Sequence, residues 1–143
     1  MQKILIINGA NINMQGKRET SIYGSTPFNI FFARLQQQYS QIQLDCFQSN
    51  IEGEIVSKIQ QSNIYDALII NPGAYTHTSI AIADALKTLN FPIIEVHISN
   101  IYNREKFRHQ SYIASCCKGR ICGMGLDGYR LAIEHIIHNH NEV

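Results

Sequence analysis

Residues 67–79 read Ala67-Leu-Ile-Ile-Asn71-Pro-Gly-Ala-Tyr-Thr-His-Thr-Ser79, an apolar run that ends in a polar loop. A short, continuous apolar run that stops at Asn-Pro-Gly is typical of a strand buried on both faces. The same pattern of an apolar run followed by a longer helical stretch recurs along the chain, which indicates a parallel sheet with helical crossovers. The expected strands are Lys3–Asn8, Leu44–Gln48, Ala67–Asn71, Ile93–His97 and Gly119–Gly123.

The stretches between these runs have the length and the end signals of helices. Pro27 suits a first helical turn, and Asn90-Phe-Pro92 suits a helix end. The alternation predicts an α/β fold, namely a flavodoxin-like, doubly wound, five-stranded parallel sheet of order 2-1-3-4-5 with helices on both faces. The expected helices are Pro27–Tyr39, Glu52–Ser62, Ser79–Leu89, a shorter Arg104–His109 and a closing Gly128–His138.

The composition is that of an ordinary globular protein. A chain of 143 residues suits one domain and is too short for a (β/α)₈ barrel, so we expect a single domain over residues 1–143. Hydrophobic residues make up 45% of the chain, which is enough for a core. The net charge is +1, which gives no reason to expect nucleic acid or an anionic membrane as a partner.

The sequence shows no targeting or cross-linking pattern. No apolar run approaches the ~20 residues of a membrane span, and the chain enters an apolar run at once, without the features of a signal peptide. We therefore expect a cytoplasmic protein with reduced thiols at Cys46, Cys116, Cys117 and Cys122. These cysteines form no C-x-x-C pair, so we do not expect a zinc site.

Polar side chains are densest after the first, third and fourth expected strands, where a doubly wound sheet binds its ligands. The loop after the first strand is long, and such loops in small domains are usually functional. Asn11 offers an amide donor there, and Arg18 and Tyr23 lie in a Gly-flanked part that can move as a lid, over about residues 11–24. The alternative is a turn-rich loop whose Asn side chains cap backbone groups.

The segment after the third strand opens with Asn71 and Gly73 and leads into the helix expected from Ser79. Backbone N–H groups at the start of that helix can bind a carboxylate. His77 can donate to a substrate hydroxyl or cap the turn. Asp84 lies in an otherwise apolar part of the helix, so it either pairs across an interface or faces solvent.

The third segment, Glu95-Val-His97-Ile-Ser-Asn, begins inside the fourth strand. Alternation along a strand places Glu95 and His97 on one face, where the carboxylate can fix the imidazole tautomer and support its charged form. A lone His is more often structural, but this pair at the carboxyl end of a parallel strand favours acid catalysis. Arg104 and Arg108 follow four residues apart, so on a helix they would share an anionic partner or a solvated face.

Together these segments resemble the type II 3-dehydroquinate dehydratases, or 3-dehydroquinases, over nearly the whole chain. The resemblance rests on the Asn-Gly-x-Asn-x-Asn start and Arg-Glu-x-x-x-Tyr-Gly end of the loop 8–24, on residues 71–79 and 95–100, on Arg104-Glu-x-Phe-Arg108, and on the closing Gly-x-Gly-x-x-Gly-Tyr129. It implies a single catalytic domain that eliminates water reversibly, in the anti sense, from 3-dehydroquinate to 3-dehydroshikimate in the shikimate pathway of aromatic amino-acid biosynthesis. It also implies no cofactor, no metal, and a homo-oligomer in the form of a trimer-based dodecamer.

The resemblance implies a role for each candidate catalytic residue. Tyr23 would remove the C2 proton next to the ketone and give an enolate. His97, oriented by Glu95, would protonate the departing C1 hydroxyl. Arg18 would be the essential arginine of the lid, and Asn11 would hold a water near the enolate oxygen.

The remaining candidates are implied in substrate binding. Asn71, Gly73 and the backbone of Ile98 and Ser99 would hold the substrate carboxylate. His77 and Arg108 would bind the ring hydroxyls. Asp84 would come from a neighbouring subunit, and Arg104 would add positive charge.

The chemistry agrees with these roles. A phenol has a reference pKa of about 10 and is a poor base at neutral pH unless nearby guanidinium groups favour its anion. We expect Arg18 and Arg108 to flank Tyr23 in this way. The chain departs from the family pattern at Ala10 and Thr20, where proline is usual, and the loss of two φ restraints predicts a lid that is more flexible when empty.

Two other functions stay open on the residues alone. A flavodoxin-like domain can bind a flavin or a nucleotide, but the loop after the first strand lacks a Ser-, Thr- and Gly-rich phosphate cradle. Gly123-Met-Gly125-Leu-Asp-Gly128 matches a dinucleotide fingerprint, but too little sequence follows it for the required strand. A receiver-like module needs acidic residues at strand ends to hold a metal, whereas the first and third strands end in Asn8 and Asn71.

Overall fold

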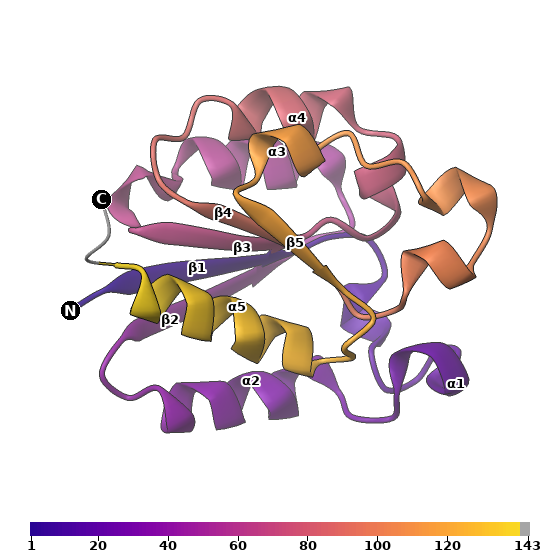
Figure 1. The fold of residues 1–143 in the computed structure, drawn as a ribbon, viewed down its shortest axis with the longest axis horizontal. Helices are drawn as coiled ribbons and strands as arrows, with labels where there is room; N and C mark the ends of the chain where they lie inside the picture. Colours follow the sequence, from indigo (N-terminus) through magenta and orange to yellow (C-terminus); the bar gives the residue numbers. More distant parts are fainter. Residues whose placement is uncertain (141–143) are drawn as a thin grey trace.

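The computed structural model describes residues 1–140, and at its centre is a sheet of parallel strands. The strands lie in the order β2-β1-β3-β4-β5, which confirms the predicted doubly wound arrangement (Figure 1). Each strand forms within one residue of its expected bounds. They are β1 (Lys3–Asn8), β2 (Gln43–Gln48), β3 (Ala67–Asn71), β4 (Ile93–His97) and β5 (Gly119–Cys122).

Helices cover both faces of the sheet (Figure 1). α2 (Phe28–Gln38) and α5 (Asp127–His138) enclose one hydrophobic core, and α3 (Glu52–Gln60) and α4 (Ile80–Leu86) enclose the other. Because the inner strands are covered on both sides, their sequences are continuous apolar runs. Within residues 1–140, no helix is long and apolar enough to cross a lipid bilayer.

The connection after β4 differs from the expected helix Arg104–His109. It contains two single-turn 3₁₀ helices, η4 (Ile101–Asn103) and η5 (Lys106–Arg108). Arg104 lies between them in an extended conformation, with φ −128° and ψ −167°. The prediction that Arg104 and Arg108 share one face of a helix is therefore wrong. The other short 3₁₀ elements outside the lid are η2 (Ser62–Ile64), η3 (Gly73–His77) and η6 (Ala114–Cys116).

The loops after β1 and β3 touch backbone to backbone where the order of the sheet reverses. The Gly9 N–H donates to the Asn71 carbonyl oxygen at 2.7 Å, and a Cβ atom on Gly9 would lie 2.1 Å from the Pro72 carbonyl oxygen. Gly73 has a φ of +65°, and a Cβ atom there would lie 2.5 Å from the Ala10 carbonyl oxygen. Both positions require glycine, and their close approach fixes the two loops relative to each other.

Three buried polar side chains join β1, β3 and α5 beneath this contact. The Tyr129 hydroxyl donates to Asn8 Oδ1 at 2.7 Å and accepts from Asn71 Nδ2 at 2.9 Å. All three residues are at most 2% exposed, and burial raises the pKa of the Tyr129 hydroxyl far above its usual range. The hydroxyl therefore stays protonated and serves as a hydrogen-bond bridge.

We expect Tyr129→Phe to lower the free energy of unfolding by about 1–3 kcal/mol, because it leaves two buried amides without their shared partner. Urea unfolding followed by circular dichroism measures the difference. Tyr112→Phe is the matched control, since Tyr112 is partly exposed. Equal stability of the two variants would contradict a structural role for the bridge.

Candidate functional site

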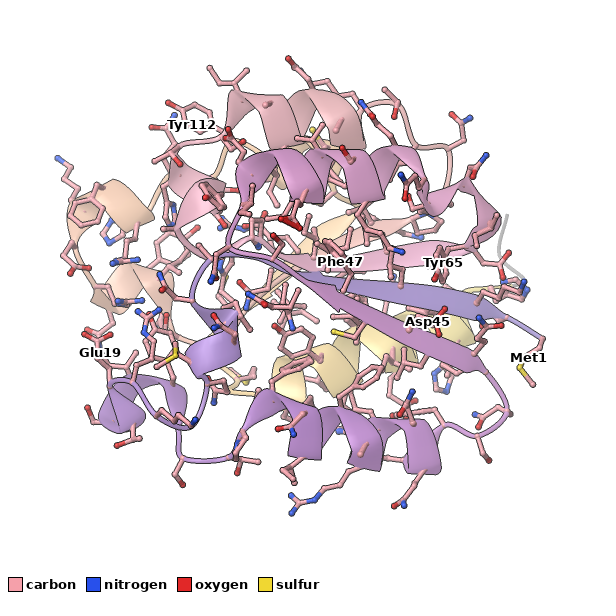
Figure 2. All side chains as sticks on the ribbon, turned by 180° about the vertical axis from the view of Figure 1, so that it is seen from behind. Met1, Glu19, Asp45, Phe47, Tyr65 and Tyr112 are labelled. Atoms are coloured by element: carbon pink, nitrogen blue, oxygen red, sulfur yellow. The ribbon has the colours of Figure 1, made fainter. Side chains whose placement is uncertain are left out.

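A cleft at the carboxyl edge of the sheet brings together most of the residues that the motifs singled out. The ends of β3 and β4 form its floor, and the lid and the connection after β4 form its walls. In Figure 2, Glu19 of the lid and Met1 lie at opposite ends of the molecule, so the cleft is remote from the start of β1. The lining residues are Ile12, Tyr23, Asn71, Gly73, His77, His97, Ile98, Ser99, Ile101, Arg104 and Arg108.

Two guanidinium groups hold the hydroxyl of Tyr23. Arg104 Nη1 donates to Tyr23 Oη at 2.6 Å, and Arg18 Nη2 donates to the same oxygen at 3.1 Å. Both cations also lie over the ring, with Cζ 5.3 Å and 4.5 Å from its centroid. Positively charged donors stabilise negative charge on the oxygen that they contact, so the surroundings of Tyr23 suit a base.

The expectation that Arg108 flanks Tyr23 together with Arg18 is wrong. Arg108 lines the cleft, but its Nε donates to Glu105 Oε2 at 2.7 Å. The extended backbone at Arg104 sends that side chain to Tyr23 instead. Because the connection forms two 3₁₀ turns, Arg104 contacts Tyr23 where Arg108 was expected, and Arg108 contacts Glu105.

A buried amide fixes the end of the lid that carries Tyr23. The lid contains η1 (Ile12–Met14) and α1 (Thr20–Tyr23). Gln15, between these helices, is only 4% exposed, and its Nε2 donates to the carbonyl oxygen of Tyr23. The greater flexibility of an empty lid stays a prediction.

His97 and Glu95 form a buried pair at the end of β4, as alternation along the strand predicts. His97 Nε2 lies 2.5 Å from Glu95 Oε2, and the two side chains are 6% and 0% exposed. A carboxylate in this position fixes the orientation of the ring and supports its charged form. The pair therefore has the features of an oriented acid at the floor of the cleft.

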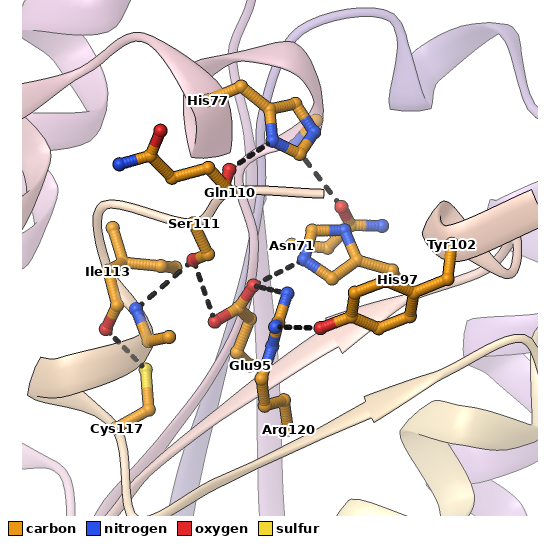
Figure 3. A network of polar contacts seen from close by, with 12 residues as sticks. Asn71, His77, Glu95, His97, Tyr102, Gln110, Ser111, Ile113, Cys117 and Arg120 are labelled. Carbon is orange, nitrogen blue, oxygen red and sulfur yellow. Dashed lines mark hydrogen bonds and ion pairs between the residues drawn. The ribbon is translucent and has the colours of Figure 1, made fainter. Parts of the chain in front are cut away.

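Three donors converge on the Glu95 carboxylate (Figure 3). Oε2 accepts from His97 and, at 3.2 Å, from Arg120 Nη2, while Oε1 accepts from Ser111 Oγ at 3.1 Å. Burial by itself raises the pKa of Glu95, but the hydrogen bonds and charges of these partners outweigh burial and lower the pKa below its usual value. Glu95 is therefore ionised at neutral pH.

His77 lies beside His97, with the two ring centroids 6.3 Å apart. Its Nδ1 is 2.7 Å from the Gln110 carbonyl oxygen, so Nδ1 is the donor. Burial, together with the charges of His97 and Arg108, lowers the pKa of His77 although the Gln110 contact opposes the change. The ring is thus neutral at neutral pH, and its Nε2 can accept a hydrogen bond.

Asn71 and Ser99 lie on the side of the cleft where the sequence predicts a carboxylate. Asn71 Oδ1 accepts from the Gly73 N–H at 3.2 Å, and Ser99 Oγ accepts from Arg104 Nη1 at 3.2 Å. Asn71 Nδ2 has two hydrogens, of which Tyr129 takes one. The second amide hydrogen and the Ser99 hydroxyl hydrogen are therefore candidate donors for an anion.

Two expected site residues lie outside the cleft. Asn11 is exposed with φ +70°, and its backbone N–H donates to Asn50 Oδ1 at 3.0 Å. Asp84 is exposed on α4, with Oδ1 3.7 Å from Lys87 Nζ. The roles implied for these two residues stay predictions.

Sequence reasoning missed Arg120 and Ser111, which both contact Glu95. A signal existed for Arg120, because it is a charged residue inside the expected strand Gly119–Gly123. Ser111 lies in a segment without a periodic pattern, and only the fold brings it to β4.

Residues 2–137 match the family model for dehydroquinase class II. The chain belongs to this family. A 3-dehydroquinate dehydratase from Histophilus somni (strain 2336) is 48% identical to this dehydroquinase over 136 residues, covering 93% of this chain and 91% of the relative. A 3-dehydroquinate dehydratase from Endomicrobium trichonymphae is 51% identical over 144 aligned positions, covering 96% of this chain and 98% of the relative.

A solved structure agrees with the family. The type II dehydroquinase from Butyrivibrio crossotus DSM 2876 superimposes with a TM-score of 0.92 at 45% identity, over 95% of this chain and 97% of that one. These findings confirm the resemblance and the fold of the dehydroquinase that the sequence predicted.

Proposed function

We propose that this dehydroquinase removes water from 3-dehydroquinate with Tyr23 as the base and His97 as the acid. The activity itself is that of the family: the chain is a type II 3-dehydroquinate dehydratase of the shikimate pathway, as its motifs predicted. One observation supports the assignment of the two groups. A single cleft holds a tyrosine hydroxyl contacted by two guanidinium groups and an imidazole contacted by a buried carboxylate.

The two groups divide the reaction into two proton transfers. Tyr23 takes the C2 proton, and the electrons of the C–H bond form an enolate with the neighbouring ketone. His97 then gives its proton to the C1 hydroxyl, the C1–O bond breaks, and water leaves as the C1–C2 double bond forms. Positive charge from Arg18 and Arg104 at Tyr23 Oη stabilises the phenolate that accepts the C2 proton.

The remaining cleft residues bind and orient the substrate. Asn71 and the backbone at Gly73 and Ile98–Ser99 hold the carboxylate. His77 accepts from one ring hydroxyl through Nε2, and Arg108 donates to another. This division places a donor or acceptor opposite each polar group of the substrate.

Asn11 completes the enolate site through a bound water. Its neighbour Ile12 lines the cleft, so a water held by the Asn11 amide is close to the opening. Closure of the lid, about residues 11–24, brings this water and Tyr23 to the substrate together.

The functional unit is a single catalytic domain over residues 1–143 that assembles as a trimer-based dodecamer in the cytoplasm. Asp84 supports this proposal, because it is exposed on α4 and lies outside the cleft of its own chain. In the assembly Asp84 reaches the cleft of a neighbouring subunit. Light scattering on wild type and Asp84→Ala, with kinetics on both, tests the assembly and the shared site.

The direct test adds 3-dehydroquinate to purified protein and follows the ultraviolet absorbance of the conjugated product. Wild type should turn over at micromolar to millimolar substrate, the usual KM range of enzymes. Failure to form the product with folded protein would contradict the proposal.

The arginine pair provides a second test. We expect Arg18→Gln and Arg104→Gln each to lower kcat by about 10²-fold or more, because each removes a charged donor from Tyr23 Oη. Arg108→Gln should raise KM more than it lowers kcat, because Arg108 contacts Glu105 rather than the base. Steady-state kinetics of the three variants separate these outcomes, and a reversed order would restore Arg108 as the partner of Tyr23.

A further inference from the structure

Arg120 is a charged side chain on β5 that does not line the cleft. The strand register places it opposite Glu95 on β4. Its Nη2 donates to Glu95 Oε2 at 3.2 Å, and its side chain is 23% exposed. The guanidinium therefore contacts the Glu95 carboxylate from β5 and is not part of the cleft lining (Figure 3).

Arg120 and His97 contact the same carboxylate oxygen, Glu95 Oε2, whereas Ser111 contacts the other oxygen. Tyr102 holds the guanidinium in place: its hydroxyl accepts from Arg120 Nη1 at 2.8 Å, and its ring centroid lies 5.9 Å from Cζ. Arg120 Nε is buried without a hydrogen-bond partner within residues 1–140. An unpaired buried N–H is unfavourable, so packing alone does not explain an arginine here.

We propose that Arg120 is a positioning residue that sets the pH range in which His97 can release its proton, by neutralising Glu95 once that proton has left. The proposal rests on the acid role given to His97 above. It concerns a residue that acts through Glu95 and does not touch the substrate.

The effect of Arg120 depends on the charge that remains in the buried site after the proton has left. With Arg120 present, loss of the proton from the His97–Glu95 pair leaves a carboxylate paired with a guanidinium. Without Arg120, the same loss leaves a buried carboxylate with no cation beside it, which is strongly unfavourable. Removing the charge of Arg120 therefore makes the proton harder to lose, and His97 becomes a weaker acid.

The other titratable or charged groups around the pair do not replace Arg120. Burial raises the pKa of Cys117 to about 12 and also raises the pKa of Cys122, so both thiols are neutral. The lowered pKa of His77 keeps that ring neutral at neutral pH. On the cleft side, the charged or titratable groups are Tyr23, Arg18, Arg104 and Arg108. Their side-chain hydrogen bonds and ion pairs are with one another, Ser99, Glu19 and Glu105.

Arg120 is consequently the one guanidinium that contacts Glu95 within residues 1–140. The lowered pKa of Glu95 agrees with this placement, because the charge of Arg120 is among its causes.

The test measures kcat and KM for dehydration from acid to alkaline pH in wild type, Arg120→Gln and Arg120→Lys. In Arg120→Gln we expect the alkaline limb of kcat to move up by about one pH unit, with kcat at neutral pH lowered several-fold and KM nearly unchanged. The acid limb should not move. Arg120→Lys keeps the charge and should restore the alkaline limb toward its wild-type position.

Arg130→Gln is the matched control. Arg130 lies on α5, pairs with Asp127 at 2.6 Å and does not line the cleft, so the substitution removes the same charge without touching the Glu95 carboxylate. We expect no movement of either limb. An equal shift in Arg130→Gln and Arg120→Gln would show a general charge effect and overturn the proposal.

An unchanged alkaline limb in folded Arg120→Gln also overturns the proposal, as does an equal shift in Arg120→Gln and Arg120→Lys. If Arg120→Gln does not fold, Tyr102→Phe removes the hydroxyl that anchors Arg120 and should shift the same limb upward by a smaller amount; no shift there rejects the proposal.

The pH profile of His97→Ala separates this inference from the proposed function. An alkaline limb that survives in His97→Ala contradicts the acid role of His97. A limb that disappears in His97→Ala but stays in place in Arg120→Gln contradicts only the role of Arg120.

Discussion

The Tyr23→Phe variant should lose about 10³-fold or more of kcat while keeping its fold, because it removes only the hydroxyl that we propose takes the C2 proton. The ring remains, so its contacts with the two guanidinium groups over its faces remain as well. The Gln15 contact is to the backbone of residue 23 and is also retained. Steady-state kinetics and circular dichroism measure the two parts of this prediction.

Tyr112→Phe is the control for Tyr23→Phe, because it removes a tyrosine hydroxyl outside the cleft. It should keep wild-type turnover. Near-normal kcat in folded Tyr23→Phe would exclude Tyr23 as the base, whatever the position of its hydroxyl.

The His97→Ala variant should lose about 10²–10⁴-fold of kcat with a much smaller change in KM, because it removes the group that we propose protonates the leaving hydroxyl. Removal of the imidazole also leaves the buried Glu95 carboxylate with Arg120 and Ser111 as its remaining partners. His138→Ala on the exposed face of α5 is the control and should behave as wild type.

Proton exchange at C2 distinguishes the acid from the base. In D₂O, His97→Ala should still exchange the C2 proton of 3-dehydroquinate, because enolate formation needs Tyr23 and not the acid. Tyr23→Phe should lose both exchange and turnover. Loss of exchange in His97→Ala as well would show that His97 acts before the enolate forms, and the two-step assignment would be wrong.

The sheet was predictable because its inner strands, β1, β3 and β4, are covered on both faces. Continuous apolar runs such as Ala67–Asn71 have no competing helical period, and the turn residues at their ends mark where they stop. The pair of Glu95 and His97 was predictable for a related reason, since the two-residue period of a strand fixes which side chains share a face.

The arrangement of the arginines was not predictable in this way. The sequence of the connection after β4 is compatible with a helix, but the chain adopts two short 3₁₀ turns and an extended residue at Arg104. Arg104 in this conformation contacts Tyr23, which lies 81 residues earlier in the chain. Local periodicity carries no information about such a contact.

The sequence also could not show which side chains contact the Glu95 carboxylate. Arg120 is a charged residue in an expected strand, which marks it in the sequence. Its contact with Glu95, however, requires the pairing of β5 with β4. Ser111 contacts Glu95 only because the chain between η5 and β5 returns over the end of β4. These contacts are set by the fold rather than by local pattern.

The bridge between Asn8, Asn71 and Tyr129 has a consequence for biosynthesis. Tyr129 is translated 121 residues after Asn8. A nascent chain on the ribosome therefore contains the loops after β1 and β3 before it contains the hydroxyl that bridges Asn8 and Asn71, where these loops begin. Catalytic competence should therefore be acquired late in translation, once residue 129 has left the exit tunnel, and not gradually as each strand is added.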